Sequence, residues 1–173
     1  ASGILAQAAS TILGDAFRNI ATIGGSVAGR FAFSDILTAL LAMDTTLVFH
    51  PGQVVSLEDF LTTRMTTGIL KAIVIAKEPS VGHFHKVMNT ANDFSTLSVA
   101  IVKAETKTTI VLGARPGVAT RANIAMRKLD GVKAPDEALF EEVAGDVSVE
   151  LTFASNHQAT ADYRRRLAKI HVR

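Results

Sequence analysis

Apolar side chains recur every three to four positions along the first part of the chain, the spacing of one face of an α-helix. This stripe predicts a helix over residues 4–17, although Gly14 weakens its last turn. A second helix is predicted over residues 36–43, with Ser34 and Asp35 offering its N-terminal cap. Because the second helix is apolar on every face, we expect it to be fully buried.

The hydrophobic pattern then changes to that of strands. A β-hairpin is predicted around the Pro51-Gly52 turn, with short strands at residues 46–49 and 53–55. A short capped helix is expected to begin at Ser56 and to end before Thr66. The β-branched side chains of residues 70–76 predict a further strand.

The second half of the chain combines strands with helices, so the fold class is α+β. Three strands are predicted, at residues 83–88, 96–104 and 107–113. Three helices are predicted, at residues 120–129, 135–143 and 159–172. A turn-rich passage from Pro79 to Gly82 separates the two halves, which predicts one domain over residues 1–78 and another over residues 79–173.

Composition narrows the classes of function. Lys and Arg total 18 against 16 Asp and Glu, so the formal charge of +2 gives no electrostatic case for nucleic acid or an acidic membrane as the main partner. The chain has 173 residues and no Cys, which excludes disulfides and Cys-ligated zinc or iron–sulfur sites within this polypeptide and fits a reducing, cytoplasmic compartment. No apolar stretch approaches the roughly 18–20 residues of a membrane helix. The start, Ala1-Ser2-Gly3, reads as the edge of a fragment and not as a signal peptide.

The pair Gly24-Gly25 is the strongest chemical feature of the first half. Glycines let a backbone turn approach a ligand closely, and their N–H groups can cradle a pyrophosphate. Thr22 and Ser26 flank the pair with hydroxyl groups, and Asp35 follows at a helix start. A plain tight turn between two helices explains the same residues, and the residues alone leave both interpretations open.

Three other groups of side chains have weaker claims. His83 and His85 share one face of a predicted strand, but no further metal ligand is near in sequence, and Lys86 lies on the opposite face. The basic run at residues 164–166 is typical of a solvated face or of salt bridges, and a nucleic-acid interface is the less favoured alternative. No nucleophile elbow supports hydrolase chemistry.

A family resemblance enters with the passage RNIATIGG at residues 18–25, continued by SDI at residues 34–36 and LLAMD at residues 40–44. These motifs resemble the FAD-binding medium subunit of the molybdenum hydroxylases, such as xanthine dehydrogenase and the aerobic carbon monoxide dehydrogenases. The similarity extends to the last helix, where ADYRR stands at residues 161–165. The fold that this resemblance implies is the C-terminal half of a PCMH-type FAD-binding domain, followed by a small domain with a three-stranded antiparallel sheet and helices.

The resemblance also implies site residues. Five consecutive residues would face the FAD pyrophosphate: Thr22, Ile23, Gly24, Gly25 and Ser26. Asp35 would contact the sugar-like chain of the cofactor, because a carboxylate accepts hydrogen bonds from hydroxyl groups. Leu70 would lie near the isoalloxazine, and Lys86 would place a cation near the same ring, where it stabilises negative charge on reduced flavin.

The implied function is electron transfer through FAD, from iron–sulfur clusters on one partner subunit to an external acceptor, in a complex with a molybdopterin subunit. The family's earlier glycine-rich flavin loop lies in an N-terminal subdomain that this chain lacks, so we expect weak FAD binding or none unless that fragment joins it. Ser26 stands for the usual Asn, and Gly29-Arg30-Phe31 for small polar residues. These departures motivate the alternative of a degenerate, non-catalytic structural or assembly module that does not bind FAD.

Overall fold

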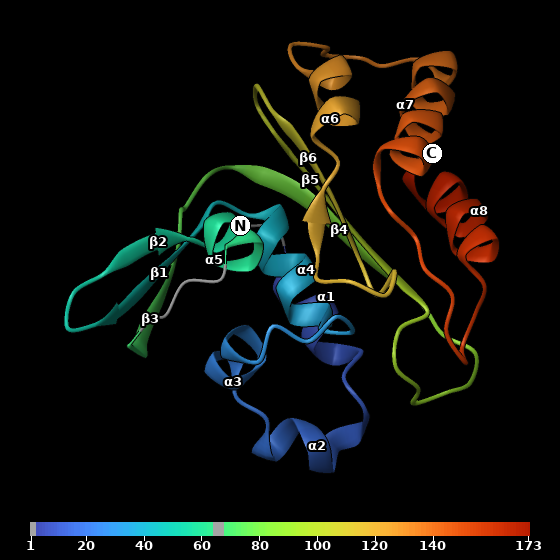
Figure 1. Ribbon diagram of the computed structural model, residues 1–173. Coiled ribbons are helices and arrows are strands. Elements are labelled where there is room, and N and C mark those ends of the chain that lie inside the picture. Colours follow the sequence, from blue (N-terminus) through green and yellow to red (C-terminus); the bar gives the residue numbers. More distant parts are fainter. Residues whose placement is uncertain (1–2, 64–67) are drawn as a thin grey trace.

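The computed structural model describes residues 3–63 and 68–173. Within them the chain forms eight helices and two antiparallel sheets (Figure 1). The helices are α1 (Ile4–Ser10), α2 (Gly14–Ile20), α3 (Ile23–Ala28), α4 (Asp35–Ala42), α5 (Leu57–Thr62), α6 (Asn123–Leu129), α7 (Glu137–Glu150) and α8 (Ala161–Val172). The strands are β1 (Thr45–His50), β2 (Val54–Ser56), β3 (Ile69–Ile75), β4 (Ser80–Val87), β5 (Leu97–Ala104), β6 (Thr108–Gly113) and β7 (Thr120–Arg121). The α+β fold class is therefore confirmed.

The helix predicted over residues 4–17 is in fact two helices. Helix α1 ends at Ser10, and α2 starts at Gly14, whose φ of +65° lies in the left-handed region. Glycine adopts this conformation without steric cost, so the chain changes direction where the periodic stripe predicted continuity. Figure 1 shows α2 displaced from α1 at the lower end of the molecule.

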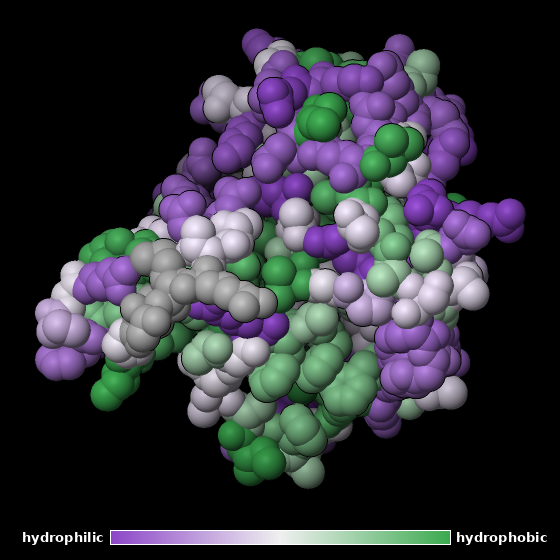
Figure 2. Space-filling model, in the orientation of Figure 1, coloured by the Kyte–Doolittle hydropathy of each residue, from purple (hydrophilic) through white to green (hydrophobic). Residues whose placement is uncertain are grey.

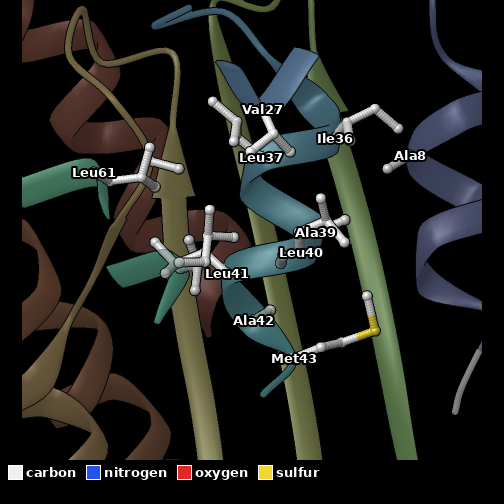
Figure 3. Packing of buried hydrophobic residues seen from close by; sticks show 14 of the residues in the cluster. Ala8, Val27, Ile36, Leu37, Ala39, Leu40, Leu41, Ala42, Met43 and Leu61 are labelled. Carbon is white, nitrogen blue, oxygen red and sulfur yellow. The ribbon is translucent and has the colours of Figure 1, made fainter. Parts of the chain in front are cut away.

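The predicted central helix is confirmed as α4, and all eight of its residues are buried. Ser34 caps it by accepting a hydrogen bond from the backbone N–H of Leu37 at 3.3 Å. In Figure 3, side chains from α1, α3 and α5 surround the helix, as the labelled Ala8, Val27 and Leu61 illustrate. Helix α4 is therefore the element around which the first half of the chain packs.

The first sheet has the strand order β2-β1-β3 and contains the predicted hairpin. Leu47 of β1 pairs with Val55 of β2 on one side and with Ile73 of β3 on the other. Helix α5 begins at Leu57, capped by Ser56 as predicted, and ends at Thr62, before Thr66 as expected.

The second sheet has the order β4-β5-β6-β7, one strand more than the three predicted. The additional β7 has only two residues, and Arg121 pairs with Val111 of β6. This pairing takes the start of the helix predicted over residues 120–129, so α6 begins at Asn123. Helix α7 continues past the predicted end at residue 143, because Ala144 and Val147 extend its buried face.

The two faces of the second sheet belong to different hydrophobic cores. Phe84, Ala100 and Val111 pack with α4, whereas Val99 and Leu112 pack with α6, α7 and α8. Helix α4 approaches the first face so closely that a Cβ at residue 113 would overlap the Thr38 hydroxyl, which only a glycine avoids. The first core thus contains residues from both halves of the chain.

None of the helices within residues 3–63 and 68–173 has the length and apolar character needed to cross a membrane.

Candidate functional site

The paired glycines lie in a helix, which corrects the expectation that they form a turn. Gly24 and Gly25 are the second and third residues of α3. Thr22 caps this helix, since its Oγ1 accepts the Gly25 N–H at 3.0 Å while its carbonyl oxygen accepts the Ser26 N–H at 3.0 Å. The cap and the fully buried Val27 stabilise the short helix despite the low helix propensity of glycine.

The first turn of α3 leaves two backbone donors available. Within the described part of the chain, no hydrogen bond engages the N–H of Ile23 or Gly24. A Cβ built on Gly24 would meet nothing within 4 Å, whereas one on Gly25 would lie 3.0 Å from Thr22 Oγ1. The open side of this turn is therefore at Gly24.

A pocket of about 440 Å³ lies beside α3, between α2, the start of α4 and β4. It is mainly apolar and is called here the aromatic pocket, because four phenylalanines line it: Phe17, Phe31, Phe33 and Phe94. Five of the predicted site residues also line it: Thr22, Gly25, Ser26, Asp35 and Lys86. Figure 2 shows hydrophobic side chains gathered on the lower part of the molecule, over α2, α3 and the loop that follows.

The other three predicted site residues line a second pocket, of about 280 Å³, called here the aliphatic pocket. Ile23, Gly24 and Leu70 meet there with aliphatic side chains of α1, α4 and β3. The structure thus divides the predicted site between two pockets that share α3. Leu70 and Lys86, which the resemblance assigns to one ring, line different pockets.

Asp35 and Lys86 form a buried ion pair at the wall of the aromatic pocket. The Lys86 Nζ lies 3.2 Å from Asp35 Oδ2, and the two side chains are 3% and 5% exposed. Asp35 also accepts hydrogen bonds from the hydroxyls of Thr11, at 3.2 Å, and Ser95, and Lys86 donates to the Thr11 carbonyl at 3.1 Å. The pair therefore joins the end of α1, the start of α4, β4 and the loop before β5.

The predicted face shared by His83 and His85 gains a third histidine from α8. The His85 ring lies 4.4 Å from the ring of His171 and 6.4 Å from that of His83, measured between centroids. Burial lowers the pKa of His171 below its ordinary value, and the neighbouring His85 lowers it further. Among residues 3–63 and 68–173, no three His, Asp or Glu side chains are arranged to hold a metal ion.

The basic run on α8 is not a uniformly solvated face, which corrects the sequence-based expectation. Arg164 is fully buried and donates to the carbonyl oxygens of Thr96, Ala154 and Ala159 at 2.7–2.9 Å. Its Nη2 donates to Asn156 Oδ1 at 2.6 Å, and burial lowers the pKa of the guanidinium. Arg164 thus holds the loop before α8 in place.

Sequence reasoning missed the aromatic side chains of the main pocket. Phe31 entered only as a departure from the family pattern, and Phe33 and Phe94 did not enter at all. The sequence did contain a signal for them: Phe31 and Phe33 stand two positions apart, shortly after Gly29, in a predicted loop.

Two family models match the chain, one on each side of the predicted domain boundary. Residues 2–77 match the FAD binding domain in molybdopterin dehydrogenase, and residues 82–173 match the CO dehydrogenase flavoprotein C-terminal domain. The boundary itself, between residues 78 and 79, stays a prediction.

Comparison with individual proteins points the same way. The chain is 29% identical over 168 residues to the glyceraldehyde dehydrogenase medium chain of Sulfolobus acidocaldarius, covering 88% of this chain and 59% of that one. It is 50% identical over 44 residues to the uncharacterized protein YgfM of Escherichia coli K12, which covers 25% of this chain and 17% of that protein.

Among solved structures, carbon monoxide dehydrogenase from Hydrogenophaga pseudoflava superposes with a TM-score of 0.86 at 26% identity, covering 98% of this chain and 64% of that one. The chain therefore spans about three fifths of the length of the dehydrogenase chains that it matches along most of its length. The matches over both halves of the sequence, together with the shared fold, show that the chain belongs to the CO dehydrogenase flavoprotein family, the FAD-binding subunits of the molybdenum hydroxylases.

Proposed function

We propose that this chain binds FAD and transfers electrons, as part of a flavoprotein oxidoreductase subunit, from iron–sulfur clusters of a partner to an external acceptor. One observation carries the proposal: two mainly apolar pockets share helix α3, in whose first turn the N–H groups of Ile23 and Gly24 make no hydrogen bond within the described part of the chain. FAD has two ring systems joined through a central pyrophosphate. The first turn of α3 would hold the pyrophosphate, and the two pockets would receive the ring systems.

The residues present fit such a ligand. The unengaged N–H groups of Ile23 and Gly24 suit phosphate oxygens, and the open space beside Gly24 admits them closely. The Ser26 hydroxyl, now donating to the Thr22 carbonyl at 3.2 Å, is a further donor of the same turn. A volume of about 440 Å³ falls in the range of roughly 300–1,000 Å³ that is usual for small-molecule sites, so the aromatic pocket accommodates one end of FAD.

The chain's own residues position the cofactor. Thr22 and Gly25 shape the turn, Ile23 and Gly24 would hold the pyrophosphate, and Leu70 gives an apolar surface in the aliphatic pocket. Asp35 would accept from a cofactor hydroxyl, and Lys86 would lie at the wall of the aromatic pocket, where Asp35 balances its charge. FAD, when bound, supplies the capacity to accept and release electrons, and the protein tunes its potential through nearby charge.

The partners follow from the same proposal. An iron–sulfur subunit would deliver electrons and a molybdopterin subunit would oxidise the substrate, in a cytoplasmic complex. A fragment equivalent to the family's N-terminal FAD subdomain is a third proposed partner. Nucleic acid and membrane are not among the proposed partners.

The flavin content of the purified chain tests the proposal. The 173-residue chain is incubated with excess FAD, passed through a desalting column and examined for visible flavin absorbance. We expect the native chain to retain flavin when the family's N-terminal FAD subdomain is added and little or none without it. Gly24→Val should retain none in either case, because the added side chain fills the space that the phosphate needs.

Gly145→Val is the matched control, since Gly145 is also a helical glycine with nothing within 4 Å of its Cβ position, but lies on α7. Equal flavin retention in Gly24→Val and Gly145→Val would exclude the first turn of α3 as the pyrophosphate site.

One observation favours the alternative, a non-catalytic assembly module of the same family. Asp35 and Lys86 already form an ion pair, and Asp35 also accepts hydrogen bonds from the hydroxyls of Thr11 and Ser95. Both charged groups therefore have partners inside the protein without a cofactor. A native chain that retains no flavin, alone or with an added N-terminal FAD subdomain, and still co-purifies with the partner subunits would establish this second function.

A further inference from the structure

Three phenylalanine rings form a continuous surface in the aromatic pocket. The rings of Phe31 and Phe33 stack at 5.3 Å with an angle of 14° between their planes, and Phe94 follows at 4.4 Å from Phe33. The three residues are 41–50% exposed, although each is large and apolar. Exposed rings that contact one another and line a pocket are a common sign of a binding surface.

The loop that carries Phe31 and Phe33 is held in shape by specific contacts. A side chain at residue 29 would overlap the Phe31 ring, so Gly29 is required for that ring position. Arg30 has a left-handed φ of 47°, and its guanidinium lies 3.8 Å from the centroid of the Phe60 ring and donates to the Thr63 carbonyl at 3.0 Å. A strained non-glycine residue that is anchored in this way indicates a conformation maintained for a purpose.

Two more hydrogen bonds hold the same loop, one to the rest of the fold and one within the loop itself. The Ala32 carbonyl accepts the N–H of Ala114 at 2.9 Å, and the Phe31 carbonyl accepts the N–H of Ser34 at 3.0 Å. The first bond ties the loop to the end of the second sheet. Both aromatic side chains are therefore presented from a rigid loop, a pre-organised state that lowers the entropic cost of binding.

Phe94 reaches the pocket from a different part of the chain. Its carbonyl accepts a hydrogen bond from the Gln158 side chain at 3.3 Å, and Gln158 is itself bound through its N–H to Asn156 Oδ1 at 2.9 Å. Asn156 in turn accepts from the buried Arg164. The loop between α7 and α8 thus positions the Phe94 ring.

We propose that Phe31, Phe33 and Phe94 form an aromatic wall that stacks on a flat heteroaromatic ring bound in the pocket, an inference that rests on the proposed function. Stacking is the contact that ring faces make best, and it tolerates differences in the polar edge of the ligand. Asp35 and Lys86 form an ion pair on another wall of the pocket, and their two charges cancel. The pocket therefore carries no net charge, which suits an uncharged ring. Both the isoalloxazine and the adenine of FAD have this chemistry.

The experiment measures dissociation constants of the full 173-residue chain for FAD, riboflavin and AMP, by flavin fluorescence and by equilibrium dialysis. Phe33→Leu and Phe94→Leu remove the ring and keep apolar bulk, and Phe33→Tyr restores a ring. We expect each Leu variant to bind FAD at least about fivefold more weakly, with Phe33→Tyr close to native, since a stacked base is worth roughly 1–3 kcal/mol. Phe140→Leu on α7 is the control away from the pocket.

The ring is identified by the ligand whose binding weakens together with that of FAD in the Leu variants. Weaker riboflavin binding indicates the isoalloxazine, and weaker AMP binding indicates adenine. If the native chain binds FAD and the Leu variants bind it equally well, the aromatic wall is excluded while the proposed function stands. If the native chain binds none of the three ligands, alone or with the family's N-terminal FAD subdomain added, both are overturned.

Discussion

The Nζ of Lys86 in β4 lies 3.2 Å from Oδ2 of Asp35, the first residue of α4, and both side chains are almost inaccessible to solvent. The two residues lie in regions that match different family models, residues 2–77 and 82–173. Their ion pair therefore connects the two matched regions through charge, in addition to the apolar core that they share. A buried charge without its partner is far more costly than either the pair or its neutral replacement.

Lys86→Met and Asp35→Asn should each destabilise the fold by about 3–5 kcal/mol, because each leaves one buried charge uncompensated. The double variant should lose clearly less than the sum of the two, since it removes both charges. Urea denaturation of the four proteins gives the free energies of unfolding. Additive losses would mean that the two side chains do not interact in solution.

The stability of the C-terminal helix should depend on the protonation of His171. Burial, and then the nearby His85, lower the pKa of His171 in the folded chain, so the unfolded chain binds the proton more readily. The stabilising contribution is therefore fully present above the unfolded pKa of about 6.5 and is lost as the pH falls through the lower, folded pKa.

Thermal melting between pH 8 and pH 5 tests this dependence. We expect the melting temperature of His171→Gln to depend less steeply on pH than that of the native chain. His157 is exposed and lies outside the group of His83, His85 and His171, so His157→Gln should behave like the native chain. Identical pH profiles for the native chain and His171→Gln would contradict the prediction.

Arg164 and Arg166 are two residues apart on α8 and should respond very differently to truncation. Arg164→Ala leaves the Thr96 and Ala154 carbonyl oxygens without their side-chain donor, removes one hydrogen bond each from the Ala159 carbonyl and Asn156 Oδ1, and opens a cavity. The loss should cost more than about 3 kcal/mol. Arg166 is exposed, so Arg166→Ala should change stability by less than about 0.5 kcal/mol. Chemical denaturation of both variants checks the contrast. Equal losses would assign the effect to helix charge instead of burial.

Sequence patterns predicted the elements whose periodicity and packing agree. Helix α4 was predicted almost to the residue, because it is apolar on all faces and has a capping Ser34. The stripe over residues 4–17 was misleading, since apolar spacing is the same in one helix as in two, and only the left-handed Gly14 separates them. Strand β7 was missed because two residues carry no periodicity, and pairing with β6 decides their conformation.

The candidate site was predictable only in part, for a related reason. Motif residues such as Thr22 and Gly24 are consecutive, so a resemblance finds them together. The division between two pockets depends on how α3 packs between α4 and β3, which no local pattern specifies. The contact between Phe33 and Phe94 joins residues far apart in sequence, so it becomes visible only in the folded chain.

Gly24 offers a direct separation of folding from binding. Its Cβ position is open and its backbone is helical, so alanine should be accepted there and should favour the helix by up to about 1 kcal/mol over glycine. Gly145→Ala on α7 should show the same stabilisation, since its surroundings are equally open. Only Gly24→Ala should weaken FAD binding, because only there does the new methyl group enter the approach to the free N–H groups.

Melting temperatures and FAD dissociation constants of both variants decide the point. If Gly24→Ala is more stable and binds FAD as tightly as the native chain, close approach of the cofactor does not explain why glycine stands at this position.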